Sequence, residues 1–94
     1  MSDRFDEIRG EITANDHAIV EAVNRRLDLV AELWAIKQNR GLDRTDPDRE
    51  RLLLEALAGA NQGPLSRDGL DELVRWLLAL TRNEIERRAD PRRG

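Results

Sequence analysis

Residues 4–39 read RFDEIRGEITANDHAIVEAVNRRLDLVAELWAIKQN, and this stretch decides the fold. Apolar side chains recur in it three or four positions apart, as they do on the buried face of an α-helix. Proline, which would break such a helix, does not occur before Pro47. Gly41 and the apolar Leu42 then follow, a pattern typical of a left-handed C-terminal cap. The stretch therefore predicts a single helix from Arg4 to about Asn39.

Two shorter helices are predicted after a polar loop. Asp46 is a good N-terminal cap for the first of them, and Pro47 suits its first helical position. Ser66 caps the next helix in the same way. The whole chain, residues 1–94, is thus predicted to be one all-α domain of three helices. The predicted bounds are about 47–59 for the second helix, about 67–88 for the third, and 89–94 for a frayed tail.

The length of the first helix has a consequence for assembly. A helix of 36 residues is about 54 Å long, whereas a compact chain of 94 residues has a diameter of only about 32 Å. One end must therefore project from the rest of the chain. That end carries Phe5, Ile8 and Ile12, whose apolar side chains need a cover. We expect a homodimer in which two long helices are shared.

Composition excludes several classes of function. The chain has 16 basic and 19 acidic side chains, a formal net charge of −3, which argues against a basic tract for nucleic acid or an anionic membrane. It has no cysteine and only one histidine, so neither a disulfide framework nor a thiolate metal site is available. Its apolar runs are too short for a membrane span, and the N-terminus lacks a secretory signal. We therefore expect a cytoplasmic protein that uses no metal and no cofactor.

Arg26 and Lys37 interrupt the apolar pattern of the long helix. They are eleven residues apart, which is about 16 Å along the axis, and at 100° per residue they point the same way. Two long cationic side chains in this arrangement can hold a small anion between them. Lys37 is also the only lysine of the chain, which either marks a position that needs a compact ammonium or is a surface lysine by chance. For Arg26 the pattern leaves an alternative open, an ion pair with Glu50.

Two further polar groups lie away from that pair. Arg9 is about 25 Å from Arg26 along the same helix, too far to reach the same small ligand. In an antiparallel dimer of long helices it lies beside the middle of the other chain, where it can complete the site of its neighbour; the alternative is a solvated arginine. Asp46, Arg49 and Glu50 are gathered in the first turn of the second helix, where backbone amides are unpaired. Such a turn can orient a hydroxyl-bearing ligand as easily as it can cap itself.

Four features of the chain occur together in a fixed order and spacing. They are the run Ile8-Arg9-Gly10-Glu11-Ile12, the pair Arg25-Arg26, Lys37, and the run Asp46-Pro47-Asp48-Arg49-Glu50. This combination resembles the all-helical (type II) chorismate mutase family, over residues 4 to about 85. The resemblance implies three-helix chains intertwined as a homodimer with two active sites, and an isomerase that rearranges chorismate to prephenate in aromatic amino-acid biosynthesis.

The resemblance also implies roles for the cationic residues. Arg26 and Arg9 of the partner subunit would bind the two carboxylates of chorismate. Thr81 matches a position where the family usually has serine or threonine near a carboxylate. Lys37 would hold the ether oxygen of the breaking bond and also touch a carboxylate. Because the rearrangement is unimolecular, it needs no nucleophile, metal or acid–base pair, and is helped by a held conformer and stabilised charge.

The ring hydroxyl of chorismate would be bound at the start of the second helix. The resemblance assigns it to Glu50 and to the backbone around Asp46, with Arg49 organising that corner. The carboxylate of Glu50 would equally suit an amine. Two related activities on the same fold therefore stay open, those of an isochorismate pyruvate lyase and of a 4-amino-4-deoxychorismate mutase.

One position departs from the family pattern. Four residues after Thr81 the family commonly has glutamine or glutamate as a second donor to the ether oxygen, whereas this chain has Ile85. Glu84 comes one residue early, which turns it 100° around the helix. If Glu84 reaches the site it must be protonated to donate, and activity would favour acidic pH; otherwise Lys37 acts with less help. The missing donor keeps a third possibility open, a non-catalytic helical dimer or a regulatory partner of another pathway enzyme.

Overall fold

The computed structural model of the protein describes residues 3–89, and within this range all the regular structure is helical. The elements are α1 (Arg4–Asn39), α2 (Pro47–Ala60) and α3 (Arg67–Ala89). The predicted all-α class is confirmed, and the bounds of α1 are those predicted. Helices α2 and α3 each end one residue later than predicted, so Ala89 belongs to α3. The rest of the predicted frayed tail, residues 90–94, lies outside the described residues.

Local hydrogen bonds fix both ends of α1. At its start, the carboxylate of Asp3 accepts a hydrogen bond of 3.2 Å from the amide of Phe5. At its end, Gly41 has a φ of 69°, in the left-handed region that a residue with a Cβ avoids. The amide of Leu42 then donates to the carbonyl of Lys37 at 2.8 Å, and the amide of Gly41 donates to Gln38 at 3.2 Å. These two bonds are a Schellman motif, and they turn the chain away from the axis of α1.

Asp46 begins α2 as the sequence predicts. Its carboxylate accepts a hydrogen bond of 3.2 Å from the amide of Arg49, and its carbonyl accepts one of 3.0 Å from the amide of Glu50. Pro47 occupies the first helical position, where its missing N–H is not needed. The turn that carries three candidate site residues is therefore held by its own cap.

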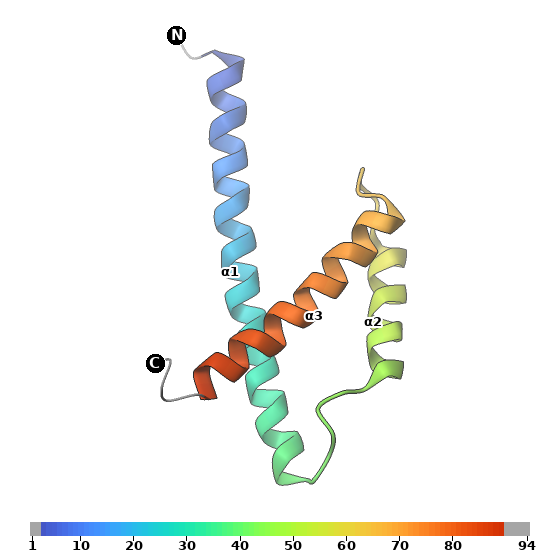
Figure 1. The fold of residues 1–94 in the computed structure, drawn as a ribbon. Helices are drawn as coiled ribbons and strands as arrows, with labels where there is room; N and C mark the ends of the chain where they lie inside the picture. The colour runs from blue at the N-terminus through green and yellow to red at the C-terminus, as the bar shows by residue number, and fades with distance from the viewer. Residues whose placement is uncertain (1–2, 90–94) are drawn as a thin grey trace.

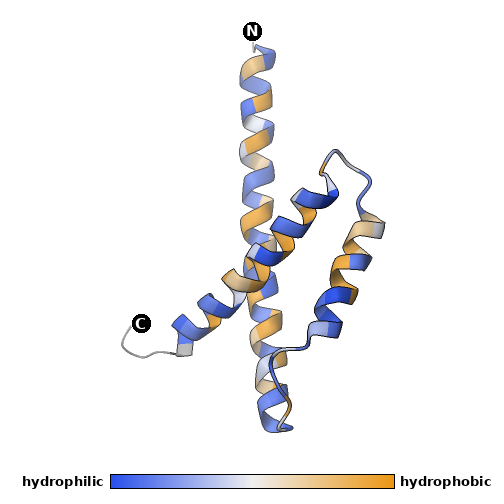
Figure 2. Ribbon diagram, turned by 45° about the vertical axis from the view of Figure 1, so that its right-hand side comes forward, coloured by the Kyte–Doolittle hydropathy of each residue, from blue (hydrophilic) through white to orange (hydrophobic). Residues whose placement is uncertain are grey.

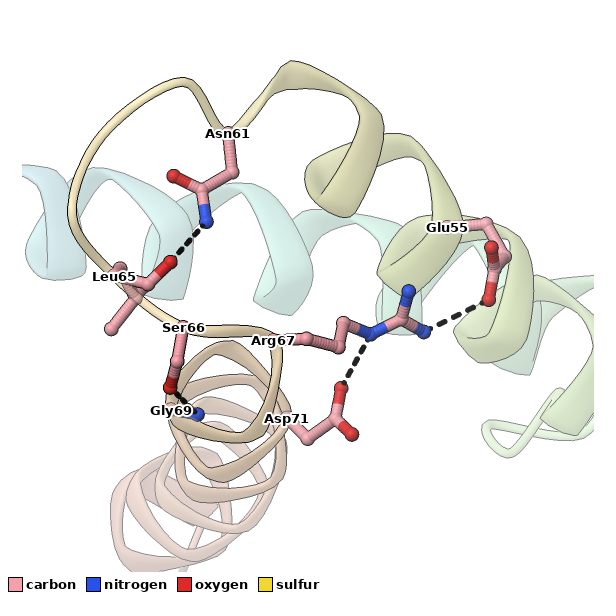
Figure 3. Close-up of polar contacts among 7 residues, drawn as sticks. All are labelled: Glu55, Asn61, Leu65, Ser66, Arg67, Gly69 and Asp71. Atoms are coloured by element: carbon pink, nitrogen blue, oxygen red, sulfur yellow. Dashed lines mark hydrogen bonds and ion pairs between the residues drawn. The ribbon is translucent and has the colours of Figure 1, made fainter.

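The connection from α2 to α3 is a short turn closed by side chains (Figure 3). The side-chain Nδ2 atom of Asn61 donates a hydrogen bond of 2.9 Å to the backbone carbonyl of Leu65. Ser66 caps α3, because its hydroxyl accepts a hydrogen bond of 3.0 Å from the amide of Gly69. Both bonds are local, so the turn reverses the chain direction without help from α1.

Arg67 ties α2 to the first turns of α3 (Figure 3). Its Nη2 atom lies 3.0 Å from a carboxylate oxygen of Glu55 on α2, and its Nε atom lies 3.0 Å from one of Asp71 on α3. The hydrogen bond to Glu55, and next the one to Asp71, raise the pKa of the guanidinium further above its ordinary value. Both pairs are exposed and add little to stability. The pair with Glu55 connects the two helices, whereas the pair with Asp71 lies within α3.

The three helices do not form a compact globule. Helix α3 crosses the second half of α1, and α2 lies alongside α3, while the first half of α1 projects beyond both (Figure 1). The molecule measures 60 × 35 × 17 Å, with a radius of gyration of 17.1 Å. Among the described residues, the buried apolar side chains are Leu27, Leu70 and Val74, all near the contacts of α3. The predicted overhang is thus present, and the protomer has a small core.

Apolar residues continue along the projecting half of α1 (Figure 2). Phe5, Ile12 and Ile19 are 61%, 54% and 52% exposed in the isolated protomer. These side chains form an apolar row that the rest of the described chain does not cover. Within residues 3–89, none of the helices combines the length and the apolar content that crossing a membrane requires.

Candidate active site

A cavity of about 770 Å³ lies between the second half of α1, the loop that follows it, α2, and the second half of α3. Its walls are partly apolar, with Trp34 of α1 and Leu53 of α2 among them. Five basic and three acidic side chains also line it, which leaves an excess of positive charge. The cavity is of the size that small-molecule sites have in proteins. The charged residues are Arg26, Lys37, Arg44, Arg49, Arg82, Asp46, Glu50 and Glu86.

Arg26 is held in the cavity wall by Thr81. Its Nη1 atom donates a hydrogen bond to the hydroxyl oxygen of Thr81, which is buried on the facing helix α3. The hydroxyl of Thr81 in turn donates to the carbonyl of Leu77 at 2.6 Å. Thr81 therefore has no proton left for a ligand carboxylate, and it orients the guanidinium of Arg26 instead. Among the described residues Arg26 makes no ion pair with Glu50, although Glu50 lines the same cavity.

Lys37 lies in the last turn of α1, half-buried in the same cavity. Its ammonium donates a hydrogen bond of 3.3 Å to the backbone carbonyl of Arg44 in the loop. One carbonyl uses only one of the three N–H groups of an ammonium, so the others are available to a ligand. Lys37 and Arg26 thus line one cavity from one helix, as their spacing predicts.

The candidate residues at the start of α2 line the opposite side of the cavity. Asp46, Arg49 and Glu50 all contribute to it, and Glu50 is half-buried. The carboxylate of Asp46 is engaged in capping the amide of Arg49. Glu50 therefore offers the freer carboxylate to a hydroxyl or an amine, and its place beside Arg49 follows from the cap that Asp46 provides.

Arg9 does not reach the cavity within one protomer. It lies on the projecting half of α1, exposed to solvent, with its guanidinium 5.3 Å from the centre of the Phe5 ring. Since α1 is one continuous helix from Arg4 to Asn39, Arg9 and Arg26 are about 25 Å apart along its axis. Arg9 can therefore contribute only to the cavity of another chain.

Glu84 and Ile85 also lie outside the lining of the cavity. The carboxylate of Glu84 pairs with Arg87 one turn further along α3. The acidic residue of α3 that does line the cavity is Glu86, next to Arg82 four residues earlier. Position 84 is turned 100° around α3 from position 85, and there the carboxylate of Glu84 meets a partner on its own helix.

Three charged lining residues are missing from the sequence prediction: Arg44, Arg82 and Glu86. None of them interrupts an apolar stripe, which is the signal that revealed Arg26. Arg44 was detectable in principle, because it is the one cation of the loop at 43–45 between Lys37 and the cap Asp46. Within the described part of the chain, no group of three or more His, Cys, Asp or Glu side chains is arranged to hold a metal ion.

The fold is all-helical, and a cavity with an excess of positive charge lies between the three helices. The chain belongs to the chorismate mutase type II family, whose pattern matches residues 8–86. The matched range includes every residue that lines the cavity. The protein is accordingly an enzyme of the isomerase class, as the sequence resemblance implied.

Solved structures support the same assignment. The chain is 25% identical to a chorismate mutase from Thermus thermophilus in its form I, over 84% of this chain and 99% of that one, with a TM-score of 0.81. Against form II of the Thermus enzyme the identity is 26%, over 90% of this chain and 97% of the other, with a TM-score of 0.84. No curated protein sequence matches the chain. The likeness therefore covers nearly the full length of the solved relatives.

Proposed function

We propose that the protein is a chorismate mutase that converts chorismate to prephenate. The observation that carries the proposal is the pair Arg26 and Lys37, which line one cavity from one face of α1. Chorismate carries two carboxylates, an ether oxygen and a ring hydroxyl, and the cavity offers cations and a carboxylate that suit these groups. Family membership and the Thermus structures support the same substrate.

In the proposed mechanism the protein supplies binding and charge. The ether C–O bond breaks while a C–C bond forms, and no group is transferred to the protein. Arg26 binds one carboxylate as a planar fork, and the hydroxyl of Thr81 keeps that fork in position. Lys37 directs its ammonium at the ether oxygen, where negative charge develops. Fixed cations in a partly apolar cavity stabilise this charge without reorganising water.

Glu50 and the backbone of Asp46 bind the ring hydroxyl in this proposal, and Arg49 organises that corner. The half-buried carboxylate of Glu50 and its position in the cavity support this role. A 4-amino analogue of chorismate, or isochorismate with loss of pyruvate, would use the same corner. Assays with each of the three substrates distinguish the activities, and we expect chorismate to give the highest kcat/KM.

A homodimer completes the site in this proposal. The exposed row of Phe5, Ile12 and Ile19 needs a cover, and a second copy in antiparallel orientation brings Arg9 of the partner subunit to the cavity. Light scattering on the purified protein should give twice the chain mass of 10.8 kDa. A monomer mass at micromolar concentration would exclude the shared site.

The reaction itself is the first test. Purified protein should consume chorismate, followed by the loss of its ultraviolet absorbance, and prephenate should appear in equal amount. The matched control is Lys37→Ala, which should lower the signal by about three powers of ten. No activity of the wild type, alone or with candidate partner enzymes, would exclude the mutase and favour a non-catalytic helical dimer. A cytoplasmic location and association with a partner pathway enzyme are predictions of the same proposal.

A further inference from the structure

Arg44 is a cation of the cavity to which the proposed mechanism gives no role. It lies in the loop at 43–45, and its side chain lines the cavity together with Arg26 and Lys37. Its guanidinium carbon lies 4.6 Å from the centre of the Trp34 ring, a cation–π contact. Trp34 also lines the cavity, so Arg44 is stacked on one of its walls.

A second contact connects Arg44 to Lys37. The backbone carbonyl of Arg44 accepts the hydrogen bond of 3.3 Å from the Lys37 ammonium. Trp34 and Lys37 are three residues apart on α1, so both contacts are made with one face of the helix. The position of Arg44 is thus set at two points, by its side chain on Trp34 and by its carbonyl on Lys37.

The charge of Arg44 has no counterpart in the described part of the chain. Within residues 3–89 no carboxylate lies within ion-pair distance of its guanidinium. Stacking on an aromatic face leaves the N–H groups at the edge of the guanidinium plane free to donate. Arg82 also lines the cavity, but no contact of the kind made by Trp34 orients it. Like Arg26, Arg44 is therefore a cation of the cavity that is oriented by a neighbour and makes no ion pair among the described residues.

We infer that Arg44 is a substrate-binding residue that holds a carboxylate of chorismate at the exposed side of the cavity, with Trp34 as its platform. This inference rests on the proposed function. Arg44 binds the carboxylate equally in the ground state and the transition state, because the carboxylate does not change charge in the rearrangement. Its loss should therefore raise KM and leave kcat nearly unchanged.

The test compares Arg44→Gln with Arg44→Lys and with the control Arg40→Gln. Glutamine is shorter than arginine and removes the charge while remaining polar, and lysine restores the charge. Arg40 is exposed at the end of α1 and lies outside the cavity lining. The substitution Arg40→Gln removes the same charge as Arg44→Gln. We expect Arg44→Gln to raise KM about tenfold, the loss typical of one charge-assisted hydrogen bond. Arg44→Lys should recover most of this loss, and Arg40→Gln should match the wild type.

Binding of a bicyclic dicarboxylate transition-state analogue, measured by calorimetry, gives a readout that does not depend on turnover. Its Kd should rise about tenfold for Arg44→Gln and stay unchanged for Arg40→Gln. An unchanged KM and Kd in Arg44→Gln would overturn the inference while the wild type remains a mutase. A parallel loss of kcat and melting temperature, not recovered in Arg44→Lys, would show that Arg44 only anchors the loop and would overturn it too. An inactive wild type would instead exclude the proposed function.

Discussion

The guanidinium of Arg26 on α1 donates to the hydroxyl of Thr81 on α3, across the crossing point of the two helices. Thr81 is buried, and its own hydroxyl proton is donated to the carbonyl of Leu77. Each hydrogen bond in this series therefore has a fixed donor: Arg26 donates to Thr81, and Thr81 donates to the backbone. A buried acceptor that faces a half-buried guanidinium restricts Arg26 to one orientation, which is toward the cavity.

This relationship predicts different effects of two substitutions at position 81. Thr81→Val keeps the shape but removes the acceptor, which leaves one Arg26 N–H without its partner. We expect kcat/KM to fall about tenfold, as for the loss of one hydrogen bond to a charged group. Thr81→Ser retains the acceptor and should stay close to the wild type in steady-state assays. Equal activity of the two variants would show that Arg26 does not depend on Thr81.

Lys37 is the residue whose removal should cost most. One donor to a developing oxyanion is typically worth about 10² to 10³ in rate, and a cation contributes more. We expect Lys37→Ala to lower kcat by about three powers of ten or more, while the melting temperature changes little because the side chain makes one long hydrogen bond to a loop carbonyl.

Lys37→Arg is the matched variant, because it keeps the charge. A planar fork replaces a compact ammonium there, so we expect it to recover little of the lost kcat. Single-turnover measurements separate the chemical step from binding in both variants. If kcat of Lys37→Ala falls by less than about tenfold, Lys37 does not act on the ether oxygen.

The pairing of Glu84 with Arg87 leads to a prediction of no effect. The carboxylate of Glu84 is engaged on its own helix and lies outside the cavity lining. We expect kcat of Glu84→Gln to stay within about twofold of the wild type, since exposed ion pairs within one helix contribute little. The pH profile of kcat should also be unchanged on the acidic side. A rise of kcat at neutral pH in this variant, where glutamine donates without being protonated, would instead assign Glu84 to the ether oxygen.

Gly41 carries the turn that brings the loop back to the cavity. At its φ of 69° an added Cβ is strained although it meets no neighbouring atom within 4 Å. We expect Gly41→Ala to lower the free energy of unfolding by about 1 kcal/mol, measured by denaturant titration. Gly59→Ala is the control, since Gly59 lies inside α2 with open space around the new Cβ and should not destabilise. An equal change in the free energy of unfolding for Gly41→Ala and Gly59→Ala would show that the turn does not need glycine at position 41.

The sequence was sufficient for the helices because each boundary has its own local signal. Asp46 with Pro47, Ser66, and Gly41 with Leu42 act within a few residues of themselves, and they depend little on tertiary packing. The overhang of α1 followed from length alone. These features predicted the bounds of all three helices to within one residue.

The contacts inside the cavity were harder to predict, because they depend on how the helices cross. The pattern on α1 marked Arg26 as an arginine in need of a partner, but it offered Glu50 where the structure has Thr81. Arg44 and Glu86 belong to a loop and to a polar helix face, where periodicity gives no signal. They line the cavity because of how α2 and α3 are placed against α1. The spacing of residues within one helix does not predict that placement.

The shared site is best tested by mixing inactive chains. In the proposed dimer each cavity takes Arg26 from one chain and Arg9 from the other. A chain with Arg9→Ala and a chain with Arg26→Ala are both expected to be inactive alone. Their heterodimer has one cavity with both arginines and one with neither. Random assembly after joint refolding makes half of all dimers heterodimers, so activity should return to about a quarter of the wild-type level.

The control for this experiment is a mixture of Arg26→Ala with Lys37→Ala. Both residues line the cavity from the same α1 helix, so every cavity in their heterodimer lacks one of them. Activity should stay at background in that mixture, since exchange of chains cannot restore an intact site. Recovery in the first mixture and not in the second requires that Arg9 acts across the dimer and that Arg26 and Lys37 act within one chain. Absence of recovery in both, with heterodimers verified by mass, would restrict the site to a single protomer and leave Arg9 in solvent beside Phe5.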